Sequence, residues 1–153
     1  MTTMCRHSGM PGNAKSEPLL VDTSVAIALL VGDHVDHRAT REAVAGRKLG
    51  LAGHAAFESF SVLTRLPGPA RRSPATVARM LAQGFPEGRF LSAEGARRLM
   101  ASLGTAGIAG GSVYDALVGA VAVEHGLPLA SRDVRALPTY RALGVRLELL
   151  RNA

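Results

Sequence analysis

Four acidic residues in this chain border strongly apolar segments, where an ionised side chain is unexpected. They are Asp22, Glu58, Asp115 and Asp133. Their largely apolar neighbours are the runs 18–21, 116–123 and 127–131 and, on either side of the second acid, Phe57 and Phe60. An ionised carboxylate in a low-dielectric interior costs several kcal/mol unless it is paired or binds a cation. Each position therefore requires a structural reason or a function.

Taken singly, three of the acids also have a structural explanation. Asp22 is placed to cap the helix that follows it, and Asp115 lies where the dipole of a helix N-terminus stabilises negative charge. Asp133 follows Arg132, so a turn residue that forms a salt bridge with an arginine would also explain it. Glu58 is expected in the middle of a buried helix, where it has no capping role, and its neighbours Phe57 and Phe60 are expected in the core. Glu58 is therefore the acid that argues most strongly for a function.

Taken together, the four acids predict a site for a divalent cation. Ligands of an open parallel sheet bind beyond the carboxyl ends of its strands, and both Asp22 and Asp133 follow predicted strands. Asp115 begins the helix that leads into the second of these strands. Carboxylates that face one crevice repel one another until protonation or a cation relieves the repulsion. Hard oxygen ligands favour Mg²⁺ or Mn²⁺ over zinc, and such an ion can hold a water that attacks a phosphodiester.

The elements that must position these acids follow from apolar runs and helix signals. Five short strands are predicted at 18–22, 49–52, 89–91, 127–131 and 145–149. Helices are predicted at 25–31, 35–46, 54–66, 74–83, 92–103 and 113–125. Residues 134–143 are expected to be helical or turn-like, with a break at Pro138. Thr23 or Ser24 is the expected cap of the first helix, Ser73 is expected to cap the helix at 74–83, and Ser92 is expected to open the next one. Gly126 is the expected end of the helix at 113–125. Strands that alternate with helices predict an α/β fold with a central parallel sheet and helices on both faces.

Size and composition exclude several classes of protein. The 153 residues, 47% of them hydrophobic, fit one domain with a buried core rather than a disordered chain. No apolar run reaches the roughly 18–20 residues that a membrane span needs. Residues 1–17 hold charges, Gly and Pro without an apolar segment, so they predict a flexible lead and not a secretory signal. The single cysteine, Cys5, allows no internal disulfide, and a cytoplasmic location is expected.

The charge balance favours a polyanionic partner. The chain has 18 basic and 12 acidic residues and a net charge of +6, and all but Lys15 and Lys48 of the basic residues are arginines. The guanidinium group is suited to phosphate oxygens, although a genome rich in Arg would give the same composition. Aromatic residues make up only 4% of the chain, without Trp, so base stacking is expected to contribute little. The candidate phosphate-positioning residues are Arg38, Arg41, Arg71, Arg72 and Arg132.

At the four acids the sequence resembles the PIN-domain ribonucleases, and within them the VapC toxins of bacterial toxin–antitoxin pairs. The matching segments are Leu-Val-Asp-Thr-Ser at 20–24, Phe-Glu-Ser-Phe at 57–60, Tyr-Asp-Ala-Leu at 114–117 and Leu-Ala-Ser-Arg-Asp at 129–133. The resemblance extends over residues 18–150, which are therefore expected to form the PIN domain after the lead at 1–17.

The resemblance implies a three-layer fold with strand order 3-2-1-4-5 and a ribonuclease that uses Mg²⁺ or Mn²⁺. It implies that the catalytic and metal-binding residues are Asp22, Glu58, Asp115 and Asp133. Thr23 or Ser24 would steady the first acid or a metal-bound water. The implied substrate is RNA, often tRNA or ribosomal RNA. The implied partners are a second copy of the chain and a cognate VapB-type antitoxin that inhibits the enzyme, with no membrane involved.

Two other functions fit parts of the pattern. A phospho-acceptor signalling domain also places acids with Mg²⁺ at strand ends, but it needs a lysine near a late strand, and this chain has only Lys15 and Lys48. A catalytically silent scaffold of the same fold, binding RNA or protein, is the second alternative. The presence of all four acids argues against the scaffold.

Overall fold

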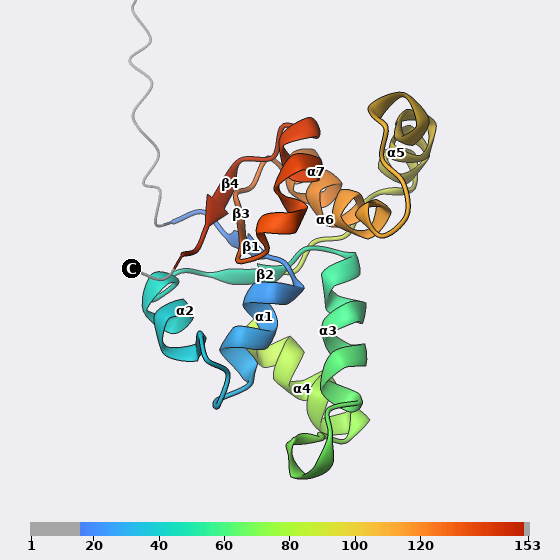
Figure 1. Ribbon diagram of the computed structural model, residues 1–153. Helices are drawn as coiled ribbons and strands as arrows, with labels where there is room; N and C mark the ends of the chain where they lie inside the picture. The colour runs from blue at the N-terminus through green and yellow to red at the C-terminus, as the bar shows by residue number, and fades with distance from the viewer. Residues whose placement is uncertain (1–15, 152–153) are drawn as a thin grey trace, which may run out of the picture.

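The computed structural model describes residues 16–151, which fold around one parallel sheet (Figure 1). The strands are β1 (Leu19–Val21), β2 (Leu49–Leu51), β3 (Leu129–Ser131) and β4 (Leu147–Leu149). They lie in the order β2-β1-β3-β4, and all neighbouring pairs are parallel. The predicted α/β class is confirmed, and the two strands followed by Asp22 and Asp133 are neighbours, as expected.

Helices cover both faces of the sheet and make three layers (Figure 1). One face carries α1 (Thr23–Leu30), α2 (His37–Ala43), α3 (His54–Thr64) and α4 (Pro74–Gly84). The other carries α5 (Ala93–Ala106), α6 (Ser112–His125) and α7 (Leu137–Ala142). Short 3₁₀ turns lie at Gly68–Ala70 and Val134–Ala136. Helices α3 and α6 also contact each other across the sheet end, so the two helical layers meet where the acids are expected.

The central strand is the most buried part of the core. Leu19, Leu20 and Val21 are all fully buried, as expected of a parallel strand covered on both faces. The helices pack onto it through side chains that include Val25 and Val121. The strand therefore ends at Asp22 as a rigid platform for the side chain that follows.

One of the five predicted strands, at 89–91, is wrong, because this part of the chain makes only isolated bridges beside β2. Gly50 pairs with Pro86 in an antiparallel bridge, and Ala52 pairs with Arg89 in a parallel one. Proline has no N–H to donate, so it interrupts a regular ladder. The chain still runs close to β2, since a Cβ on Gly50 would lie 2.1 Å from the carbonyl oxygen of Glu87. The expected order 3-2-1-4-5 is thus found without its outermost strand.

The helix starts agree with most of the capping signals. Ser73 and Ser92 each accept a hydrogen bond from the backbone N–H three residues later, as predicted. The first helix differs, because Asp22 is its N-cap and accepts from Val25 N, so Thr23 and Ser24 lie inside the helix. The segment 134–143 divides into the 3₁₀ turn at Val134–Ala136 and α7, and Pro138 lies in the first turn of α7, where its missing N–H costs nothing.

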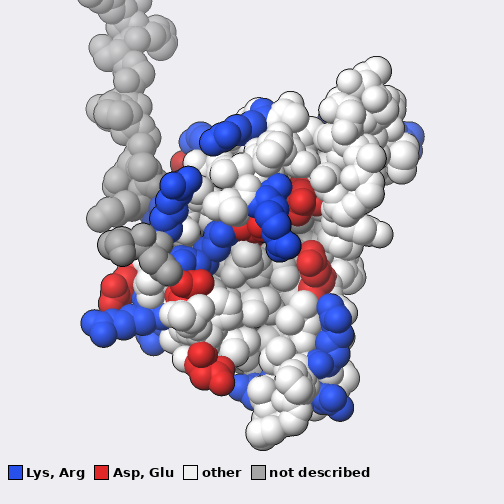
Figure 2. Space-filling model, in the orientation of Figure 1, with Lys and Arg blue, Asp and Glu red and all other residues white. Residues whose placement is uncertain are grey.

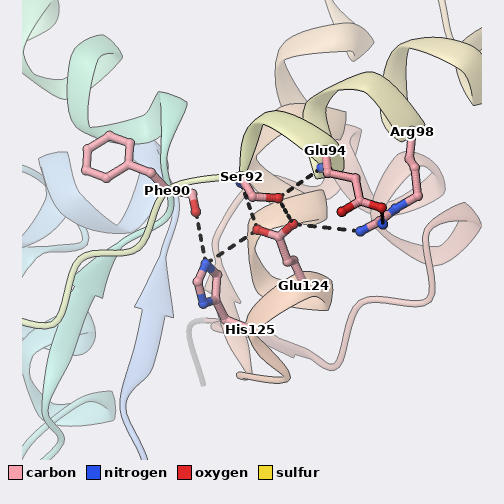
Figure 3. A network of polar contacts seen from close by, with 7 residues as sticks. Phe90, Ser92, Glu94, Arg98, Glu124 and His125 are labelled. Carbon is pink, nitrogen blue, oxygen red and sulfur yellow. Dashed lines mark hydrogen bonds and ion pairs between the residues drawn. The ribbon is translucent and has the colours of Figure 1, made fainter.

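Helix α5 is attached to α6 through a polar network at its N-terminus (Figure 3). The carboxylate of Glu124 accepts hydrogen bonds from the backbone N–H of Ser92 at 2.9 Å and from its hydroxyl at 2.5 Å. These bonds lower the pKa of Glu124. On the neighbouring residue, His125 Nε2 donates to the carbonyl oxygen of Phe90 at 2.9 Å. The network fixes the path of the chain from Phe90 to Ser92.

Two predictions concern the ends of the chain and membranes. Residues 1–15 of the predicted lead, with Cys5, lie outside the described residues, so the boundary between 1–17 and 18–150 stays a prediction. Glu17 forms an ion pair with Arg146 at 3.2 Å. None of the helices within residues 16–151 combines the length and the apolar character that a membrane crossing requires.

Candidate active site

All four predicted acids line one pocket at the carboxyl end of the sheet. The pocket has a volume of about 210 Å³, and its wall also contains Thr23, Ser24, Arg135 and Tyr140. Figure 2 shows acidic side chains near the centre of this face, where α1, α3, α6 and α7 come together in Figure 1, with basic side chains on either side. The fold therefore gathers into one place acids that are far apart in the sequence.

Asp22 is the most buried of the four acids, with 5% of its surface exposed. Its Oδ1 accepts hydrogen bonds from Ser24 Oγ at 2.5 Å and from Val25 N at 3.3 Å. Its Oδ2 accepts from Ser131 Oγ at 2.5 Å and from Tyr140 Oη at 3.0 Å. Burial raises the pKa of Asp22, and these four donors oppose that rise. The carboxylate is therefore fixed in orientation but carries a desolvation cost.

The two serines bonded to Asp22 also hold the loop that carries Asp133. Ser24 Oγ accepts a hydrogen bond from Arg132 N at 2.9 Å, and Ser131 Oγ accepts from Asp133 N at 3.0 Å. Each hydroxyl thus donates to one acid and accepts from the backbone that presents another. The position of Asp133 relative to Asp22 follows from this shared network.

Glu58 reaches the pocket from an exposed face of α3, so the prediction that it is buried is wrong. Its carboxylate accepts a hydrogen bond from Thr23 Oγ1 at 3.1 Å, which ties α3 to the first turn of α1. Phe57, predicted to be core, is 66% exposed, whereas Ser59 is fully buried. Helical spacing alone did not tell which face of α3 turns inward. The structure also separates two roles, since Ser24 supports Asp22 and Thr23 supports Glu58.

Asp115 lies half-buried in the first turn of α6 and feels the other three acids. Burial is the main cause that raises its pKa, followed by the negative charges of Asp133, Asp22 and Glu58, while Arg135 opposes the rise. A carboxyl group of this kind resists ionisation until a positive charge comes near it. A cation bound in the pocket would therefore favour the ionised form of Asp115 and reduce the repulsion among the four carboxylates.

The arginines near the pocket differ from those expected from the sequence. Arg135 lines it, and its Nε lies 3.3 Å from Asp133 Oδ1 with a side chain that is 90% exposed. Arg132, a predicted phosphate contact, is mostly buried and pairs with Asp36 at 3.1 Å. Arg38 pairs with Glu42 in the next turn of its helix. The basic group placed to meet a phosphate at this pocket is therefore Arg135, which the sequence analysis did not single out.

The acids face one pocket but are not drawn together around a point. Within residues 16–151, no three side chains of His, Cys, Asp or Glu form a ready metal-binding group. Asp22, Glu58 and Asp133 each bond to a donor of their own, as described above. The donor set is nevertheless all oxygen and strongly negative, which fits Mg²⁺ or Mn²⁺, and Mg²⁺ keeps several waters and needs only one or two direct carboxylates. The residues present therefore fit a hydrated divalent ion.

Two further residues of the site were missed in the sequence. Ser131 and Tyr140 hold Asp22 from positions 109 and 118 residues away along the chain. Burial and the charge of Asp22 raise the pKa of Tyr140, so its hydroxyl stays protonated and donates. Ser131 could have been found in the sequence, because it lies in the segment 129–133 that carries Asp133. No local sequence signal pointed to Tyr140.

Comparison with known proteins places this geometry in a family. The model of the family described as "PIN domain" matches residues 19–141. Among curated proteins, Ribonuclease VapC27 of Mycobacterium tuberculosis is 47% identical over 130 residues, which cover 85% of this chain and 95% of that protein. Ribonuclease VapC40 of the same species is 40% identical over 131 residues, covering 84% of this chain and 96% of that protein.

Solved structures with a similar fold have little sequence in common with this chain. A FitAB structure bound to a DNA fragment has a TM-score of 0.64 at 15% identity and covers 86% of this chain and 94% of that chain. FitAcB from Neisseria gonorrhoeae has a TM-score of 0.61 at 16% identity and covers 84% of this chain and 95% of that chain. At these identities the likeness concerns the fold alone.

Proposed function

The chain belongs to the PIN-domain family and, within it, to the VapC ribonucleases, and from this we propose that it hydrolyses RNA phosphodiester bonds as the toxin of a toxin–antitoxin pair. The proposal extends to a requirement for Mg²⁺ or Mn²⁺. The observation that carries it is the placement of four carboxylates around one pocket at the carboxyl ends of β1 and β3. Ligands bind at this position in open parallel sheets.

Each acid has its own role in the proposed site. Asp22, fixed by four donors, is the rigid ligand of the cation, and Asp115 on α6 is its partner across the pocket. Glu58 and Asp133 add two further negative charges to the pocket. Thr23 holds Glu58 through a hydrogen bond, and Arg135 holds Asp133 through an ion pair. A divalent ion bound there would lower the pKa of a water and neutralise charge on the scissile phosphate.

The chain's own groups handle the substrate in this proposal. Asp115 or Asp133 orients the attacking water, since these are the less buried aspartates of the pocket. Arg135, exposed at the rim, contacts a phosphate oxygen of the RNA backbone. We propose tRNA or ribosomal RNA in the cytoplasm as the substrate, a homodimer as the active form and a VapB-type antitoxin as the inhibitor, as the family resemblance implies.

The alternative of a phospho-acceptor domain receives no support from the pocket. The lysine such a domain needs is not among its lining residues, and Lys48, on the loop before β2, does not line it. A basic group is present in Arg135, but it pairs with Asp133 through an exposed side chain. Ribonuclease chemistry accounts for the four acids together.

The test is cleavage of a fluorescently labelled RNA by the purified chain in Mg²⁺ or Mn²⁺ and in EDTA. We expect cleavage only with the metal, and a fall of at least about 100-fold for Asp22→Asn and for Asp115→Asn, because either change removes a carboxylate from the site. Asp33→Asn is the matched control, since it removes an exposed carboxylate outside the pocket and should cut at the native rate. Native-rate cleavage by either pocket variant, with circular dichroism unchanged, would refute the assignment.

A further inference from the structure

A second groove adjoins the acid pocket and shares two of its residues. It has a volume of about 620 Å³, and Glu58 and Asp115 line both hollows. The rest of its wall includes two aromatic rings, Phe57 and Tyr114, and the exposed side chain of Arg65. A molecule in this groove would therefore lie directly beside the four carboxylates.

The exposed aromatic residues of the protein gather at this groove. The chain has only four Phe and two Tyr residues. Three of these six rings are more than half exposed, namely Phe57 at 66%, Phe90 at 58% and Tyr114 at 54%. Phe90 lies against Phe57, with ring centroids 6.1 Å apart. A chain so poor in aromatic residues thus places half of them on the surface next to its acid site, and exposed apolar groups that cluster mark a binding surface.

Contacts within the protein position Tyr114 and the backbone of Phe90. Tyr114 stacks on His54 with centroids 4.9 Å apart and ring planes 19° from parallel. The backbone on both sides of Phe90 is fixed, because Arg89 O accepts from Gly53 N at 2.8 Å and Phe90 O accepts from His125 Nε2 at 2.9 Å. In Figure 3 the Phe90 ring points away from the polar network that holds its backbone. Rigid rings lose little freedom when a ligand stacks on them.

We propose that this groove is a subsite that stacks an unpaired RNA base on Tyr114 and Phe57, with Arg65 against a neighbouring phosphate. The inference rests on the proposed ribonuclease function and adds the form of RNA that the site accepts. Every base has a π-face, so stacking tolerates any sequence. Bases inside a double helix stack on each other and offer no free face, so the subsite selects RNA with an unpaired nucleotide beside the cut.

Aromatic residues thus have a larger expected role in this protein than their number alone indicates. Their low number predicts little base stacking, but their placement concentrates them at one spot next to Glu58 and Asp115. Arg65, at the end of α3, adds a positive charge to a groove whose floor is otherwise negative. A nucleotide presents the matching pair of groups, an apolar ring and an anionic phosphate.

The test is the binding of a short fluorescein-labelled oligouridylate, measured by anisotropy in EDTA so that no cleavage takes place. The same oligonucleotide with a single abasic ribose, moved through each position in turn, reports the value of each base. We expect Tyr114→Ala to weaken binding of the intact RNA about 5-fold to 100-fold and to lose the difference between intact and abasic RNA. Tyr114→Phe keeps the ring and should bind like the wild type.

A matched pair of arginine variants tests the phosphate contact. Arg65→Gln should weaken binding and lower its salt dependence, because one phosphate contact is lost. Arg97→Gln removes the same charge from an exposed position on α5 outside the groove and should change neither. Equal effects of the two variants would mean that only net charge matters, which would overturn the phosphate contact.

Two other outcomes would overturn the subsite. One is a Tyr114→Ala protein that binds as the wild type does or keeps the full penalty for an abasic ribose. The other is a wild type that is dimeric by gel filtration and becomes monomeric on Tyr114→Ala, which would make this face an interface between copies. Because binding is measured without metal, failure of the ribonuclease proposal would appear separately, as absence of cleavage when Mg²⁺ or Mn²⁺ is added.

Discussion

The hydroxyl of Tyr140 offers the sharpest test of how the acid site is built. It is buried, donates to Asp22 Oδ2 at 3.0 Å and stays protonated because burial and the charge of Asp22 raise its pKa. Tyr140→Phe removes this oxygen and leaves the ring that packs in the core. Asp22 Oδ2 then keeps only the Ser131 hydroxyl as a donor.

The size of the effect follows from the burial of the bond. A hydrogen bond to a charged group contributes about 1.5–3 kcal/mol to stability. For a chain of this length, that loss lowers the Tm by about 5–10 °C. Activity should fall as well, since the Asp22 carboxylate loses one of the contacts that orient it.

The loss should depend on pH in a definite direction. Burial raises the pKa of Asp22, and the Tyr140 hydroxyl is one of the donors that oppose the rise. A donor that favours the ionised carboxylate contributes stability above the folded-state pKa and loses that contribution as the pH falls through it. The Tm difference between wild type and Tyr140→Phe should therefore be largest at neutral pH and shrink in acid.

The assay is thermal unfolding in EDTA, followed by circular dichroism over a pH series. Tyr114→Phe is the control, because it removes a hydroxyl from an exposed ring and should leave the Tm unchanged. Equal Tm values for Tyr140→Phe and the wild type at neutral pH would contradict the reasoning. A deficit that stays constant down to acid pH would also contradict it, because the lost contact would then not involve an ionised Asp22.

Three more outcomes are expected. Mn²⁺ at 100 times its Kd should stabilise the wild type by about 2.7 kcal/mol in a melting assay, and should stabilise an Asp22→Asn, Asp115→Asn double variant much less; an equal shift would refute a metal site at these acids. Gly95→Ala should lower the Tm, since its Cβ would lie 2.3 Å from Oε1 of Glu124 and push α5 from its anchor; an unchanged Tm would show that the contact yields freely. Thr23→Val removes the hydroxyl that donates to Glu58 and should raise the metal concentration needed for half-maximal cleavage. A metal titration of the cleavage rate measures this concentration, and a value equal to that of the wild type would mean that the contact is not needed.

Signals between near neighbours in the chain predicted much of the fold. The caps at Ser73 and Ser92 and the helix end at Gly126 were confirmed, because each depends on bonds within a few residues. The alternation of strands and helices likewise predicted the parallel sheet. The strand predicted at 89–91 is not formed, because the chain meets β2 and the residue after it only through two isolated bridges, at Pro86 and at Arg89.

The orientation of α3 was beyond the reach of sequence patterns. Glu58 lies between aromatic residues, and this neighbourhood predicted burial. In the structure α3 turns Ser59 and Leu63 inward and leaves Glu58 and Phe57 exposed. A helix with apolar residues on most sides carries no clear mark of its inner face, so packing against α1 and α4 decides it.

Apart from the strand expected at 89–91, the sequence by itself determined the order of the elements, because that order depends on local runs of residues. It also pointed to the four acids, because each stands beside an apolar segment. Only the tertiary structure decided how those acids are supported. Ser131 and Tyr140 reach Asp22 across more than a hundred residues, and the exposed rings gather beside Glu58 and Asp115. Such contacts arise from the packing of α3, α6 and α7 around the end of the sheet, and no local pattern encodes them.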